Sequence, residues 1–168
     1  PSPFRDDFGA VDGSFGPLRN LEGTRFKWRT GNWSGKRELR YQSETERDST
    51  GDELNAAWAV EKLEELAESG KPFLMGLGFI RPHTPLIVPQ KYFDLFPLES
   101  IKLPDILPGD VEDTFKHTLA PGSDDRSDDR GHKMYSSLIK SFKGNRDLAL
   151  RKFIQACLAS VASVDDLV

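Results

Sequence analysis

The eight residues from Phe73 to Ile80, "FLMGLGFI", constrain the fold more than any other part of this 168-residue chain. The run is continuously apolar, it is too short for a typical packed helix, and its two glycines weaken helices. Continuous apolarity, rather than alternation, is typical of a strand covered on both faces, as in a parallel sheet. The run therefore predicts a buried strand.

A helix is predicted just before this run. The residues "TGDE" at 50–53 fit a capping box, in which the Thr50 hydroxyl accepts from the Glu53 amide and the Glu53 carboxylate accepts from the Thr50 amide. Gly70 and Pro72 predict the end of the helix. Helix, tight turn and buried strand in succession favour an α/β fold. The apolar stripe expected on the helix is Ala56, Ala59, Val60, Leu63, Leu66 and Ala67.

Arg81 and His83 follow the predicted strand directly, where functional side chains of parallel sheets gather. Prolines at 82 and 85 predict extended backbone around His83. In extended chain Arg81 and His83 share one face, so both would face one pocket. An imidazole can protonate a leaving oxygen near neutral pH, and a guanidinium fits carboxylate or sulfate. A turn histidine and a surface arginine remain the alternative interpretation.

The rest of the chain is less regular. Residues 1–48 have no lasting period and predict irregular structure with one short strand, whereas "PQKYFDLF" at 89–96 predicts a short helix. Residues 116–131 predict a polar loop, whose aspartates lack the spacing of a calcium loop and are interpreted as a solvated charge run. A final helix is expected with the stripe Leu150, Phe153, Ile154, Cys157, Val161, Val164 and Val168, and its uncapped end predicts that the natural chain continues.

Composition excludes several classes of function. The net charge of −4 and a pI of about 5.4 argue against nucleic acid as the main partner. A single cysteine, Cys157, leaves no internal disulfide, and no apolar run approaches the roughly 20 residues of a membrane span. His117 and His132 have no second ligand at metal-binding spacing, so neither is predicted to have a functional role.

Three stretches together resemble the middle of a sulfatase, and specifically the iduronate-2-sulfatase-like branch of that family. They are "ELNAAWAVEKLEEL", "KPFLMGLGFIRPHTPLIVPQKYFDLFPLESIKLP" and "RKFIQACLASVASVDDLV". The resemblance is good over residues 50–104 and 131–168 and loose over residues 1–48. It implies an α/β domain of the alkaline phosphatase-like superfamily, with a mixed sheet flanked by helices. Residues 1–168 would be the central part of one catalytic domain, incomplete at both ends, with residues 50–168 as its helix–strand–loop–helix core.

The resemblance also implies a reaction, the hydrolysis of sulfate esters, either small molecules or sulfated glycans. In this family a formylglycine, made from Cys or Ser in a C/S-x-P-x-R motif, attacks sulfur, and a Ca²⁺ ion held by Asp and Asn or His screens the sulfate. His83 matches the family histidine that binds sulfate and protonates the leaving group. Arg81 takes a weaker role toward the sulfate or an acidic sugar. Relatives are usually exported, which implies a periplasmic or secreted protein.

The chain departs from the family pattern because it contains neither the C/S-x-P-x-R motif nor the family's metal-binding pairs. The nucleophile and the calcium ligands are therefore expected outside it, and the isolated chain is predicted to be inactive. Two alternatives stay open at this point. One is a fragment of a related phosphodiesterase or phosphonate hydrolase, and the other is a non-catalytic module that binds sulfated glycans and folds alone.

Overall fold

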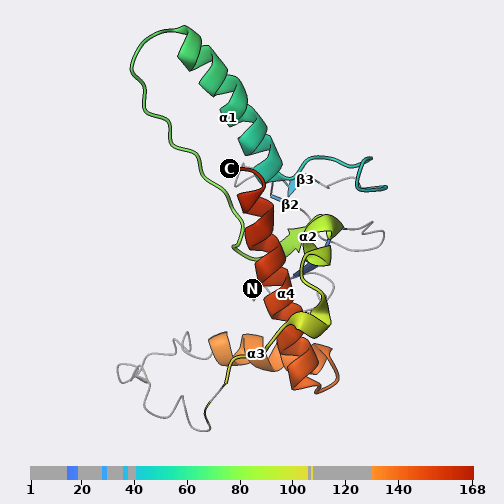
Figure 1. Ribbon diagram of the computed structural model, residues 1–168. Helices are drawn as coiled ribbons and strands as arrows, with labels where there is room; N and C mark the ends of the chain where they lie inside the picture. Colours follow the sequence, from blue (N-terminus) through green and yellow to red (C-terminus); the bar gives the residue numbers. More distant parts are fainter. Residues whose placement is uncertain (1–14, 19–27, 30–35, 38–40, 106, 108–129) are drawn as a thin grey trace.

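The computed structural model describes residues 15–18, 28–29, 36–37, 41–105, 107 and 130–168 (Figure 1). The elements in chain order are β1 (Phe15–Pro17), β2 (Trp28–Arg29), β3 (Lys36–Arg37), α1 (Gly51–Glu68), β4 (Leu86–Val88), α2 (Gln90–Asp94), the 3-10 turn η1 (Leu98–Ser100), α3 (Arg130–Ser141) and α4 (Arg146–Asp165). The expectations for Asp124–Asp129 and for His117 lie outside the described residues.

A two-stranded parallel sheet lies at the centre of the fold. β1 pairs with β4, with Phe15 opposite Leu86, and the amide of Leu18 extends the ladder by donating to the carbonyl of Val88 over 2.8 Å. All three residues of β4 are buried. β2 and β3 form a separate antiparallel pair. Helices around a small parallel sheet are compatible with the predicted α/β class, although the buried parallel strand is β4 rather than the run at 73–80.

Helix α4 packs against this sheet and against α2 (Figure 1). Its closest face consists of small side chains, and Ala149, Ala156 and Ala159 are fully buried there. The ring of Phe153 meets Phe15 of β1 edge to face, with 5.6 Å between the ring centroids. Part of the predicted stripe packs against this core: Leu150, Phe153 and Cys157. Val161 is 52% exposed, and Val168, which lies beyond the end of α4, is 94% exposed, so the stripe was wrong at these two positions. Alanines let the helix backbone approach the strands closely. Larger side chains such as Val161 then lie on the exposed side of the helix.

Helix α1 begins and ends as predicted. The Glu53 amide donates to the Thr50 hydroxyl over 3.3 Å, the Thr50 amide donates to the Glu53 carboxylate over 2.6 Å, and Gly70 follows with a φ of +64°. Of the expected stripe Ala59 is buried, but the prediction was wrong at Val60, which is 58% exposed, and at Leu63, which is 43% exposed. The reason is the placement of α1, which projects away from the body formed by α2, α4 and β4 (Figure 1).

The strand predicted at 73–80 is not a strand in this structure. The chain returns from α1 to β4 as a long loop, in which Leu74 is 99% exposed and Phe73 is 47% exposed (Figure 1). A strand requires a neighbour that accepts and donates backbone hydrogen bonds. No described strand pairs with this segment. An apolar run alone therefore did not determine a strand.

The structure contains two further helices, α2 and α3. α2 lies between Pro89 and Pro97, as predicted. α3 was not predicted, because the polar loop was expected to continue to residue 131 and no separate helix was proposed beyond it. Within the part of the chain that the structure describes, no helix is long and apolar enough to cross a membrane.

Candidate functional site: the turn from Arg81 to Pro85

The segment that carries Arg81 and His83 is a turn placed directly before β4. The His83 amide donates to the carbonyl of Ile80 over 2.8 Å and closes the turn. Both X–Pro peptide bonds, Arg81–Pro82 and Thr84–Pro85, are cis. The extended backbone predicted from the prolines was wrong, because the hydrogen bond from the His83 amide to the Ile80 carbonyl closes a turn.

His83 presents its imidazole on the surface. Its Nδ1 lies 2.7 Å from the carbonyl oxygen of Thr84. A carbonyl oxygen only accepts, so Nδ1 carries the proton in this contact. In the neutral ring Nε2 then holds the free lone pair, and in the charged ring Nε2 is a second donor. The contact fixes one tautomer, which is how a histidine is prepared for proton transfer.

Arg81 is buried, in contrast to the exposed His83, and only 6% of its surface is exposed. Its Nε donates to the carbonyl of Ile87 in β4 over 3.4 Å. Burial of the guanidinium lowers the pKa of Arg81 from 12.5 to about 10, and the Asp52 carboxylate opposes that shift. Arg81 therefore stays positively charged at neutral pH. The structure does not bring Arg81 and His83 together on one exposed face, as the extended chain would have done.

Asp52 is the residue that sequence reasoning missed. It lies in the first turn of α1 and is 5% exposed. Its Oδ1 accepts from the Ile80 amide over 2.7 Å and its Oδ2 accepts from the Arg81 amide over 3.1 Å. The sequence signal was an acidic residue inside the capping box, which indicates only a helix start. Nearby, the Asn55 side chain donates to the carbonyl of Gly78 over 3.1 Å.

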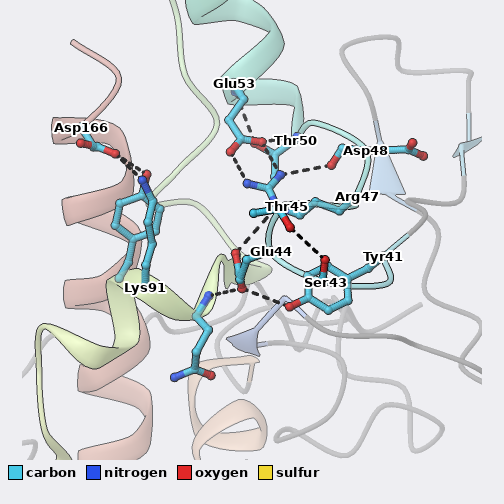
Figure 2. Close-up of polar contacts among 12 residues, drawn as sticks. Tyr41, Ser43, Glu44, Thr45, Arg47, Asp48, Thr50, Glu53, Lys91 and Asp166 are labelled. Carbon is cyan, nitrogen blue, oxygen red and sulfur yellow. Dashed lines mark hydrogen bonds and ion pairs between the residues drawn. The ribbon is translucent and has the colours of Figure 1, made fainter.

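A polar network holds the start of α1 in place (Figure 2). Arg47 donates two hydrogen bonds to the Glu53 carboxylate, over 2.8 and 2.6 Å. Burial is the largest single influence on the Glu53 pKa and raises it, but the hydrogen bonds from Arg47 and Thr50, with the Arg47 charge, outweigh it and leave the pKa lowered. Glu44 connects the same network to α2, because it accepts from the Gln90 amide over 2.9 Å.

A second cluster joins α2 to the end of α4. Lys91 and the Tyr92 hydroxyl both donate to the Asp166 carboxylate, each over 2.7 Å. The hydrogen bond from Lys91, followed by that from Tyr92, lowers the pKa of Asp166. This cluster closes the packing between two helices. Among the residues that the structure describes, no three His, Cys, Asp or Glu side chains lie close enough to hold a metal ion.

Curated sulfatases match part of this sequence. A sulfatase from Formosa agariphila is 48% identical over 56 residues, which are 33% of this chain and 11% of that protein. A third of this chain is homologous to sulfatases. The human and mouse iduronate 2-sulfatases are each 35% identical over 63 residues, which are 34% of this chain and 12% and 11% of those proteins. The predicted resemblance to sulfatases is thus confirmed. The matches span about a tenth of the relatives' length, and no protein-family model or solved structure matches the chain significantly.

Proposed function

We propose that this chain is part of the catalytic domain of a sulfatase, an enzyme that hydrolyses sulfate esters. The observation that carries the proposal is the match to the Formosa agariphila sulfatase. The complete domain would have the alkaline phosphatase-like architecture, with a larger sheet than the two strands β1 and β4. Its substrates would be sulfate esters of small molecules or of sugars, sulfated glycans included.

In this proposal His83 acts at the sulfate group. Its Nδ1 is bound to the Thr84 carbonyl, so Nε2 is the atom that faces the reaction. The protonated ring would donate a hydrogen bond from Nε2 to a sulfate oxygen or to the ester oxygen. As the sulfur–oxygen bond breaks, the Nε2 proton passes to the departing oxygen, and a neutral alcohol leaves. The exposure of the ring on a closed turn supports this role.

The other parts of the mechanism belong to residues outside this chain. The nucleophile would be a hydrated formylglycine, and Ca²⁺ would neutralise negative charge on the sulfate when bound. The contact proposed for Arg81 with the sulfate or an acidic sugar requires a guanidinium that a substrate can reach. Arg81 is 6% exposed here, which favours a role inside the turn instead.

The test uses the protein encoded by the complete reading frame around residues 1–168, assayed with 4-methylumbelliferyl sulfate. We expect turnover in that protein and none in the isolated 168-residue chain. His83→Ala should reduce kcat by roughly 10²- to 10⁴-fold, the usual contribution of a general acid. Glu61→Gln, on the exposed surface of α1, is the matched control and should leave kcat unchanged. Full turnover in His83→Ala would refute the role of this histidine.

A further inference from the structure

We propose that Asp52 is a positioning residue, whose buried carboxylate fixes the backbone at Ile80 and Arg81 and thereby the turn that presents His83. The position of the turn is a property of this fold. Only the chemical purpose of that position rests on the proposed function.

The contact has the geometry of a clamp. Two consecutive amides, those of Ile80 and Arg81, point at one side chain that lies 28 and 29 residues earlier in the chain. One carbonyl oxygen rarely satisfies two consecutive amides, whereas the two oxygens of a carboxylate fit them. Each bond is charge-assisted, which makes it stronger than a bond between neutral groups. Because Asp52 is 5% exposed, water cannot easily replace it as the acceptor.

The clamp acts on His83 through one peptide unit. The Arg81 amide donates to Asp52 over 3.1 Å, and the Ile80 carbonyl, which belongs to the same peptide unit, accepts from the His83 amide over 2.8 Å. The side chain of Arg81 also joins the start of the turn to β4, because its Nε donates to the carbonyl of Ile87. The Asp52 charge also stabilises the buried Arg81 cation. The start of the turn is therefore held by both α1 and β4.

A purely local role for Asp52 in starting α1 does not account for these contacts. An acidic side chain in the first turn of a helix usually interacts with the helix dipole and its free amides. In α1 the side chains of Thr50 and Glu53 already form the capping box. Both oxygens of Asp52 bind a different segment, the end of the long loop from α1. The carboxylate thus links two segments that the backbone leaves apart.

The experiment uses the ¹⁵N-labelled 168-residue chain and its Asp52→Asn variant, with Asp147→Asn as control. Asp147 is likewise an acidic residue in the first turn of a helix, α4, but among the described residues it pairs only with its neighbour Arg146. In Asp52→Asn, amide hydrogen exchange at Ile80, Arg81 and His83 should accelerate roughly ten- to a hundredfold, as expected for losing charge-assisted hydrogen bonds. Exchange at Ala156, in the core of α4, should be unchanged. The control should change none of these amides.

Two spectroscopic readouts separate positioning from general stability. The ring Nδ1–H signal of His83, which reports its bond to Thr84, should be lost in Asp52→Asn and restored in Asp52→Glu. In the wild-type chain labelled with ¹³C as well as ¹⁵N, scalar couplings across the hydrogen bonds should connect the Ile80 and Arg81 nitrogens with the Asp52 carboxyl carbon. Absence of those couplings would overturn the proposal without any variant, even if Asp52→Asn failed to fold. Unchanged exchange at Ile80 and Arg81, or equal acceleration at Ala156, would overturn it as well.

Kinetic measurements on the protein of the complete reading frame distinguish failure of this inference from failure of the proposed function. There, Asp52→Asn should lower kcat at least tenfold while KM changes less than twofold, because substrate binding by the rest of the site is untouched. If His83→Ala kept full turnover, the role of His83 would fail. The couplings and the exchange rates in the 168-residue chain would still decide whether Asp52 holds the turn.

Discussion

Replacing Glu53 with Gln should lower the free energy of unfolding by about 2 kcal/mol. The substitution removes the negative charge of the carboxylate that pairs with Arg47. Two hydrogen bonds join these side chains, and hydrogen bonds to charged groups each contribute about 1.5–3 kcal/mol. The Arg47 and Glu53 side chains are 12% and 22% exposed, so solvent screens the pair in part and the lower end of the range applies, about 3 kcal/mol for the two bonds. A neutral bond from Arg47 to the glutamine oxygen returns about 1 kcal/mol, which leaves a loss of about 2 kcal/mol. A glutamine oxygen can still accept from the Thr50 amide, so the helix cap itself survives.

The assay is urea unfolding followed by circular dichroism, at pH 7 and in acid, with the exposed Glu61→Gln as the matched control. The folded-state pKa of Glu53 lies below 4.5, its ordinary value, so its contribution is complete above the ordinary pKa and disappears as the pH falls through the folded one. The difference between wild type and Glu53→Gln should therefore shrink below about pH 4.5. A difference under about 0.5 kcal/mol at pH 7, or one that persists in acid, would refute the reasoning.

Three further predictions follow from burial, and the first two use the same unfolding assay. Leu86→Ala should cost about 2–5 kcal/mol because that side chain is 1% exposed, whereas Leu74→Lys, at 99% exposure, should change stability by less than about 0.5 kcal/mol; equal losses would contradict the fold. Ala159→Leu should cost about 1–3 kcal/mol by forcing α4 away from its neighbours, and a stabilised variant would show that the space is larger than described. Burial raises the pKa of the Cys157 thiol, so alkylation at pH 7.5 should be slow in the native chain and fast in urea when followed by mass spectrometry; equal rates would place Cys157 at the surface.

Sequence patterns predicted the features that depend on near neighbours. The capping box at Thr50 and Glu53, the end of α1 at Gly70 and the short helix after Pro89 each involve residues within a few positions of one another. Burial depends on what packs from elsewhere in the chain. The same apolar periodicity therefore gave an exposed face on α1, and in α4 the alanines rather than the valines face the sheet.

The candidate site was predictable only in part for the same reason. The chemistry proposed for His83 rests on its residue type and on the resemblance to sulfatases. The burial of Arg81 depends on β4, and the clamp of Asp52 joins residues 28 and 29 positions apart, which no local pattern encodes. The run from Phe73 to Ile80 has the local pattern of a strand but forms none here, because no described strand pairs with it.

The most direct test of the account is the sequence of the coding DNA on both sides of residues 1–168. If the chain is part of a sulfatase, we expect a C/S-x-P-x-R motif in frame before residue 1 and an Asp-His or Asp-Asn pair in frame after residue 168. Those segments would supply the nucleophile and the metal ligands that a sulfatase requires. A start codon directly before Pro1 and a stop codon directly after Val168 would contradict the account, because such a protein would contain neither.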